Sequence, residues 1–164
     1  MTDVKENGSF RGMRRFKQQI PERECIEILK NEMRGVLAVS GDNGYPYAFP
    51  IDFVYDDGKI YFHCAKEGYK IDCLKRNDKA SFCVYDKGFI KDGDWALNIK
   101  SVVIFGRISF VDDEKKAVDK LRRLGLKYFP EPSDVEKEIK KYLSRVLMLE
   151  LTIDHMTGKL VNES

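Results

Sequence analysis

A strictly alternating segment, Tyr45–Tyr55, constrains the fold of this chain more than any other feature. Large apolar or aromatic side chains occupy its odd positions, whereas small or polar side chains such as Pro50 and Asp52 occupy most even positions. A period of two residues predicts a β-strand with one buried face. Asp56-Asp57-Gly58 then predicts a hairpin turn, after which residues 59–64 return as a second strand.

Similar patterns predict the other elements of the chain. Short apolar or alternating runs predict strands, and apolar residues at helical spacing predict helices. The expected strands are 36–40, 45–55, 59–64, 79–85, 99–111 and 145–153, and the expected helices are 20–33, 70–76, 112–128 and 133–143. Six strands joined mostly by short turns favour a closed or nearly closed antiparallel β-barrel with peripheral helices over a parallel βαβ fold.

The two ends of the chain, the charged helices and one long loop complete the predicted organisation. We expect residues 1–13 to form a mobile N-terminal arm and residues 14–164 to form a single domain. The charged helices 112–143 are interpreted as solvated, and residues 87–97, with the single tryptophan Trp95, as a long loop. Residues 155–164 are expected to be a terminal tail that either frays or reaches across a dimer.

Composition excludes several classes of protein. The chain has 164 residues, of which 43% are hydrophobic, so it is long enough and apolar enough to bury a core. Twenty-nine basic and 27 acidic residues give a net charge of +2, which argues against a nucleic-acid-binding protein. No apolar run is long enough to span a membrane, and the N-terminus does not resemble a secretory signal. We therefore expect a cytoplasmic protein.

The cysteines and histidines do not predict a metal site. Four cysteines are scattered without a C-x-x-C pair, and the two histidines, His63 and His155, lie far apart in sequence. The chain also lacks the phosphate-binding P-loop, the Rossmann glycine pattern, the H-E-x-x-H zinc motif and the G-x-S-x-G elbow. These absences remove the simplest predictions of nucleotide hydrolysis, dinucleotide binding, metalloproteolysis and acyl transfer.

The segment from His63 to Lys70 is the best candidate for a binding site. It joins the end of a predicted strand to the start of a short predicted helix, and it contains Gly68. Free amides at a helix start and a nearby ammonium group favour a phosphate. By strand parity, His63 and Ser101 both point away from the barrel core, so they could converge with Lys70 on one anionic ligand. The alternative is a solvated loop with ordinary surface charges.

The order of these motifs resembles a known family. The run PYAFPIDFVYDDGKIYFHCAKEGYKIDCLKRNDKASFCVYD, the later SVVIFGRI and the closing TIDHMTGK are similar to pyridoxamine 5′-phosphate oxidase-like flavoproteins, and more narrowly to the branch of the 5-nitroimidazole-resistance proteins. The resemblance covers roughly residues 14–160. It implies a six-stranded FMN-binding split barrel that works as a homodimer, with each flavin between two subunits.

The resemblance also implies roles for single residues. Pro50 and Ile51 would run beside the isoalloxazine ring, and Lys70 would hold the phosphate with Ser101 completing that pocket. The approach to the ribityl chain would be lined by His63, Cys64 and Ala65. One departure matters, because Tyr69 stands where the oxidase proper has the arginine of an Arg-Lys pair. This departure argues against the vitamin B6 reaction itself.

The function implied is that of an FMN-dependent oxidoreductase. It would pass electrons from a reductant such as a nicotinamide nucleotide to a small organic acceptor, for example a nitroaromatic compound. No residue is assigned as catalytic. Two alternatives stay open: a flavin-storing or flavin-sensing protein without turnover, and a small barrel that binds single-stranded nucleic acid. The near-zero net charge argues against the last of these.

Overall fold

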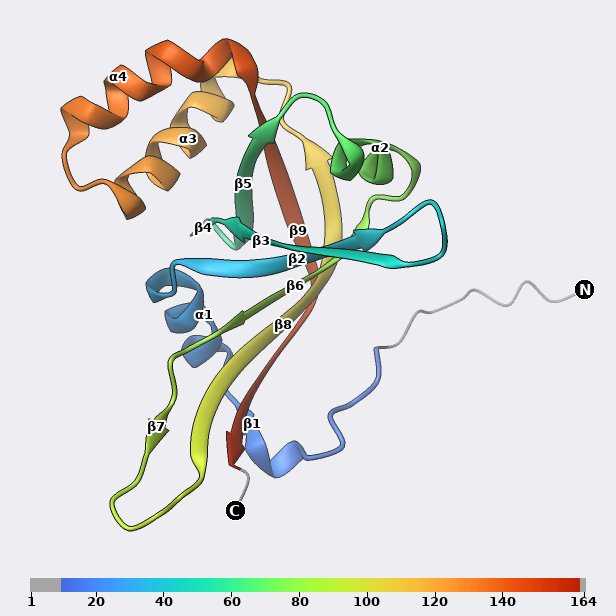
Figure 1. Cartoon of the computed structure of the whole chain (residues 1–164), viewed down its shortest axis with the longest axis vertical. Helices are drawn as coiled ribbons and strands as arrows, with labels where there is room; N and C mark the ends of the chain where they lie inside the picture. Colours follow the sequence, from blue (N-terminus) through green and yellow to red (C-terminus); the bar gives the residue numbers. More distant parts are fainter. Residues whose placement is uncertain (1–9, 163–164) are drawn as a thin grey trace, which may run out of the picture.

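The computed structural model describes residues 10–162 of the chain (Figure 1). Its elements are the strands β1 (Gln19–Ile20), β2 (Arg34–Ser40), β3 (Pro46–Asp52), β4 (Val54–Asp56), β5 (Lys59–Ala65), β6 (Lys79–Tyr85), β7 (Phe89–Ile90), β8 (Leu97–Phe110) and β9 (Val146–Asn162), the helices α1 (Glu22–Asn31), α2 (Tyr69–Arg76), α3 (Glu114–Tyr128) and α4 (Pro132–Tyr142), and the 3-10 turns η1 (Phe16–Gln18) and η2 (Leu143–Arg145). Of the predicted arm, residues 1–9 lie outside the described residues, and residues 10–13 have no regular structure.

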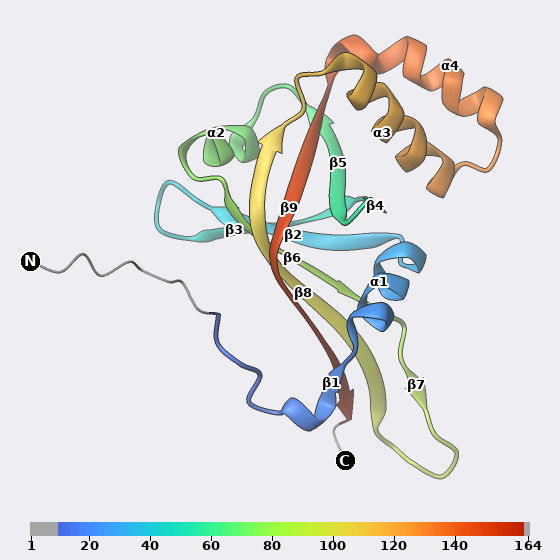
Figure 2. The ribbon, with the colours of Figure 1, turned by 180° about the vertical axis from the view of Figure 1, so that it is seen from behind.

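One antiparallel sheet forms the body of the molecule. Its strands run in the order β3-β2-β6-β8-β9-β5-β4, while β1 pairs with β9 and β7 pairs with β8. The sheet curls so that β2 and β3 cross the direction of β5 and β9, as both views show (Figures 1 and 2). The predicted antiparallel barrel architecture with peripheral helices is confirmed, with the sheet curled into a half-barrel rather than closed. The expected six strands become nine over residues 10–162.

The predicted strand 45–55 is in fact two strands separated by a corner at Phe53. Strand β3 pairs with β2, whereas β4 pairs with β5, so the chain passes from one end of the sheet to the other at this residue. The side chain of Phe53 is fully buried, which is why the alternating pattern continues unbroken through the corner. The hairpin turn follows as predicted, with positive φ angles at Asp57 and Gly58.

The predicted C-terminal tail is wrong, because residues 155–162 continue strand β9. They pair with β8 along its whole outer half, and Gly158 also pairs with Ile20 of β1. A register shift between Phe105 and Gly106 admits one extra residue of β9 at this point. His155 lies opposite Phe105, and the ring of Phe10 stacks on His155 with 4.6 Å between ring centroids. The long apolar strand β8 thus provides a partner for residues that look terminal in the sequence.

Three fully buried phenylalanines form the centre of the core. Phe82 of β6 makes edge-to-face contacts with Phe53 at 4.9 Å and with Phe62 of β5 at 5.0 Å between ring centroids. Edge-to-face aromatic pairs add stability beyond the apolar area they bury. Gly35 of β2 allows this packing, because a Cβ atom there would lie 2.3 Å from the Phe82 ring. The triad therefore joins the corner, the centre of the sheet and strand β5.

Helix α3 corrects a further prediction, since its charged face is turned toward the sheet. Lys116, Lys120, Arg123 and Lys127 recur at spacings of four, three and four residues, which places them on one side of the helix. The ammonium groups of Lys116 and Lys120 lie 2.5 Å from Glu150 and 2.6 Å from Asp56, and Arg123 also contacts Asp56 at 3.3 Å. These cations anchor α3 against the β4–β5 hairpin and strand β9.

Glu150 of β9 is buried, and its carboxylate accepts the hydrogen bonds that hold α3 to the sheet at this point. Burial alone would raise its pKa, but hydrogen bonds from Lys116, Lys59 and Tyr61 outweigh burial and lower the pKa to about 2. A carboxyl group with a lowered pKa stabilises the folded state above its ordinary pKa of 4.5, and this contribution is lost as the pH falls toward 2.

We therefore expect Glu150→Gln to lower the free energy of unfolding most at neutral pH. The difference from the unmodified protein should shrink steadily between pH 4.5 and about 2. Denaturant titrations at several pH values check this expectation, with the exposed Glu138→Gln as the control. A difference that stays constant with pH would contradict the assignment.

Candidate functional site

Three predicted site segments meet where the curled sheet is split. They are the free edge of β3, the end of β5 and the start of α2, which follows β5 after a short loop (Figure 1). Strand β3 ends the sheet order on one side, and β5 with β4 ends it on the other. The split therefore brings two edges of one sheet beside a helix start.

Strand β3 presents unpaired backbone to the split. It pairs with β2 along one edge, where Pro50 lies opposite Val36 and Ile51 opposite Gly35. No strand of the described residues pairs with its other edge. Pro50 is exposed and Ile51 is buried, so the strand turns one face to solvent and one to the core. Such an edge can offer carbonyl and amide groups to the polar rim of a planar ligand.

The end of β5 carries the next three predicted residues. Cys64 is buried with the core, Ala65 is exposed at the strand end, and His63 is half-buried on the opposite face. The Nδ1 atom of His63 is buried and has no hydrogen-bond partner. Burial lowers the pKa of His63, the ammonium of Lys70 lowers it further, and Asp52 opposes the shift. A neutral imidazole with an unsatisfied buried nitrogen is suited to bind a ligand at this point.

Helix α2 begins with the features expected of an anion site. Gly68 precedes it with a φ of +133°, a conformation that favours glycine, and no side chain of the described residues caps the first turn. The amides of Ile71 and Asp72 bond back to the carbonyl of Gly68, so they do not point to a ligand. Lys70 places its ammonium 4.6 Å from the ring centroid of Phe49 on β3. This cation–π contact holds Lys70 over the split.

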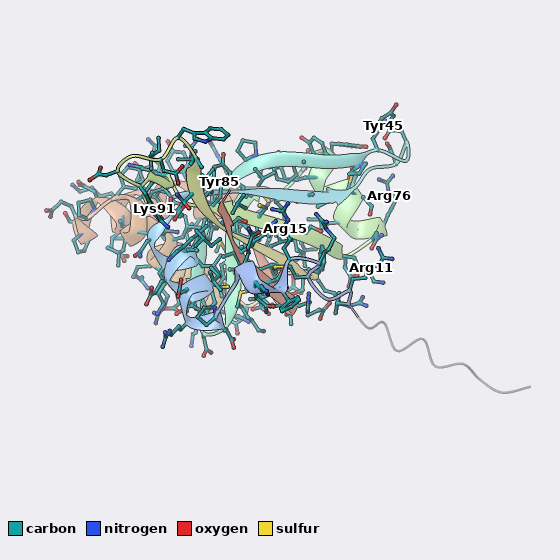
Figure 3. All side chains as sticks on the ribbon, turned by 90° about the horizontal axis from the view of Figure 1, so that it is seen from below. Arg11, Arg15, Tyr45, Arg76, Tyr85 and Lys91 are labelled. Atoms are coloured by element: carbon teal, nitrogen blue, oxygen red, sulfur yellow. The ribbon has the colours of Figure 1, made fainter. Side chains whose placement is uncertain are left out.

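Tyr69 has a structural role that explains the departure from the oxidase pattern. Its hydroxyl donates to a carboxylate oxygen of Asp42 at 2.8 Å and accepts from the Asp42 amide at 3.1 Å. Arg76, at the other end of α2, lies 3.7 Å from the same carboxylate. Tyr45 marks the tip of the β2–β3 hairpin, with Arg76 on the helix below it (Figure 3). Tyr69 thus fastens α2 to the hairpin.

The structure does not bring Ser101 to the other site residues within one chain. Ser101 lies opposite Lys159 of β9, whereas His63 lies opposite Met148 of the same strand. Met148 and Lys159 are 11 residues apart along β9, which corresponds to roughly 35 Å between the positions of His63 and Ser101. The expectation that Ser101, His63 and Lys70 converge on one ligand is therefore wrong for a single chain.

Two residues of the site were missed by sequence reasoning. Phe49 supports Lys70, and Asp52 acts electrostatically on His63. Both belong to the alternating strand, one on its core face and one on its outer face. Their positions were visible in the pattern, but their proximity to α2 and β5 depends on the corner at Phe53. The sequence contained no signal for that corner.

A family model, described as pyridoxamine 5′-phosphate oxidase, matches residues 21–160 and so includes all of these segments. The chain belongs to this family. The match spans most of the chain, from the residue before α1 to the last part of β9, and it agrees with the order of motifs quoted above. A search of curated proteins gave no match.

Several solved structures share the fold of this pyridoxamine 5′-phosphate oxidase family protein. A Bacteroides thetaiotaomicron protein with a suggested role in 5-nitroimidazole antibiotic resistance is 20% identical, with a TM-score of 0.75, 88% of this chain covered and 87% of that one. An FAD-binding protein from Mesorhizobium loti is 22% identical, with a TM-score of 0.64 and coverages of 87% and 96%. An FAD- and heme-binding protein from Mycobacterium smegmatis is 22% identical, with a TM-score of 0.72 and coverages of 90% and 74%.

Two further observations concern residues 10–162. They contain no cluster of three or more histidine, cysteine or acidic side chains that could hold a metal ion. None of their helices is both long and apolar enough to cross a membrane.

Proposed function

We propose that this protein binds FMN at the split of its sheet and transfers electrons through it to a small organic acceptor. The observation that carries the proposal is the unpartnered, buried Nδ1 atom of His63, which lies between an unpaired strand edge and a helix start with a lysine. A buried polar atom without a partner in the protein is rare, so this position favours a ligand that can supply a hydrogen bond.

The chemistry of the three segments fits FMN. Its phosphate carries about −1.5 to −2 charges at neutral pH and needs at least one cation together with amide donors. Lys70 supplies the cation, and the amides of Tyr69 and Lys70, which precede those bonded back to Gly68, supply the donors. The isoalloxazine ring is flat, apolar on its faces and polar along its rim, so Pro50 and the free edge of β3 suit it. Flavin supplies the one- and two-electron chemistry when it is bound.

The chain's own residues would bind and orient in this reaction. Lys70 would hold the phosphate, and β3 would fix the ring through its backbone. His63 and Ala65 would line the approach between them, with Cys64 closing the core side. Because burial and Lys70 lower the pKa of His63, its imidazole is neutral near pH 7 and can donate or accept one hydrogen bond. A nicotinamide nucleotide is our candidate reductant.

A second copy of the chain completes the proposed site. Ser101 cannot reach the site of its own chain, but it lies on β8 opposite Tyr85, close in sequence to Leu97 and Asn98, which pair with β7. Strand β7 and the start of β8 form an arm that extends from the sheet (Figure 1). The buried Asn98 fixes this arm through hydrogen bonds to the carbonyls of Phe89 and Ala96. The arm, together with the end of β6 that precedes it, exposes five large apolar side chains, namely Tyr85, Phe89, Ile90, Trp95 and Leu97. An exposed apolar surface of this kind favours association.

Purified protein tests this proposal directly. We expect a yellow protein with flavin absorbance bands, release of FMN on denaturation as identified by mass spectrometry, and sedimentation as a dimer. Bleaching by a reduced nicotinamide nucleotide and recovery on adding an acceptor would support the oxidoreductase. A flavin that no nicotinamide nucleotide reduces would support a storage protein, and protein that stays colourless in excess FMN would overturn both.

A further inference from the structure

We propose that Lys127 and Tyr128 of α3 are positioning residues for the cofactor site, because they hold the Phe53 corner that sets β3 against β5. This inference rests on the proposed flavin function. The corner matters because Pro50 and Ile51 precede it on β3, whereas His63, Cys64 and Ala65 follow it on β5. Any change in the angle at Phe53 therefore moves one wall of the site relative to the other.

The contacts of the two side chains converge on this corner. The ammonium of Lys127 donates to the carbonyls of Phe53 at 3.1 Å and Leu29 at 3.4 Å, and it lies 3.7 Å from the centroid of the Phe53 ring. The hydroxyl of Tyr128 accepts from the Phe53 amide at 3.1 Å and also contacts the carbonyls of Phe53 and Met33. Both backbone polar groups of Phe53 are thus satisfied by α3.

Satisfying these groups is necessary because the corner interrupts the sheet. Phe53 lies between β3, which pairs with β2, and β4, which pairs with β5. Its amide and carbonyl have no strand partner, and its side chain is fully buried. Buried backbone groups without partners are costly, so the corner requires donors and acceptors from another element. The contacts with Leu29 and Met33 also connect the corner to α1 and to the start of β2.

Lys127 differs from the other three cations of its stripe on α3. Lys116, Lys120 and Arg123 all contact carboxylates, whereas Lys127 contacts no carboxylate of the described residues within ion-pair distance. Burial lowers its pKa to about 8, an effect that Asp52 and Glu32 partly oppose. A cation that is desolvated without a counter-ion costs stability, which is not expected of a lysine that serves only to anchor a helix. Its contacts specify the geometry of the corner.

The experiment measures FMN binding and the environment of the bound ring. We expect Lys127→Met to raise the dissociation constant of FMN about three- to ten-fold, in the range of effects that act through an intermediate residue. The visible circular dichroism of the bound flavin should change as well. Lys127→Arg, which keeps the charge and the donors, should recover most of the affinity. Lys115→Met, on the exposed side of the same helix, is the matched control and should change neither.

Tyr128→Phe provides a second variant if Lys127→Met does not fold. It keeps the ring and removes only the hydroxyl, and we expect the same change in dichroism. A lower melting temperature with unchanged FMN affinity and unchanged dichroism would overturn the positioning role and leave the flavin function intact. If the unmodified protein does not bind FMN, the proposed function and this inference both fail.

Discussion

Replacing Lys70 by alanine should remove most of the bound flavin. Lys70 is the cation placed over the split, held there by the ring of Phe49 at 4.6 Å. A hydrogen bond to a charged group contributes about 1.5–3 kcal/mol, which corresponds to roughly a 10- to 150-fold weaker FMN affinity. The loss should be large because Tyr69, the neighbouring residue, is occupied by Asp42 and supplies no second cation.

Titration of the flavin-free protein with FMN, followed by flavin fluorescence, measures this effect. Lys75→Ala is the matched control, because Lys75 lies on the same helix and is exposed. The affinity of the control should stay within about two-fold of the unmodified protein, as expected for a surface substitution. If Lys70→Ala retains full affinity, the phosphate does not bind at the start of α2. Riboflavin, which lacks the phosphate, should bind Lys70→Ala and the unmodified protein with equal affinity.

Truncating Phe82 to alanine should destabilise the protein more than any change at the site. Phe82 is fully buried and contacts Phe53 and Phe62, so its removal leaves a cavity between the corner and β5. Phenylalanine-to-alanine substitutions in cores cost about 3–5 kcal/mol, a large part of the stability of a domain of this size. The expected result is a strongly lowered denaturation midpoint.

Phe82→Leu separates the loss of volume from the loss of aromatic contact. We expect it to cost less than half of the alanine value, since most of the volume is kept. Both variants should be compared by urea titration in the absence and presence of FMN. Equal stabilities of Phe82→Ala and the unmodified protein would show that the triad does not form the core.

The barrel could be predicted from sequence because its local patterns are consistent. The alternation along residues 46–52 and the Asp56-Asp57-Gly58 turn each determine a local structure, and the structure contains both the strand and the turn. The strand-to-helix junction that precedes Lys70 could also be predicted, and the structure contains it between β5 and α2. The binding role of this junction stays a prediction. Local signals of this kind are largely independent of the rest of the chain.

The remaining features depend on contacts between distant residues. The corner at Phe53 exists because α3 supplies partners for its backbone, 74 and 75 residues further along the chain. Residues 155–162 become a strand only because β8 is long enough to pair with them. The charged face of α3 was interpreted as solvated, since nothing in its own sequence reveals that Glu150 and Asp56 lie opposite.

The free edge of β3 has a consequence for solubility. An unpaired strand edge is a template on which another chain can add a strand, and repeated addition leads to aggregation. Two of the seven residues of β3, Pro46 and Pro50, have no amide hydrogen. Prolines occur in sheets mainly on edge strands, with the missing donor toward the open side. Because these prolines cannot donate a hydrogen bond, the edge that offers carbonyl groups to a ligand is a poor template for a strand of another chain. The site can therefore stay open to a ligand without making the protein prone to aggregation.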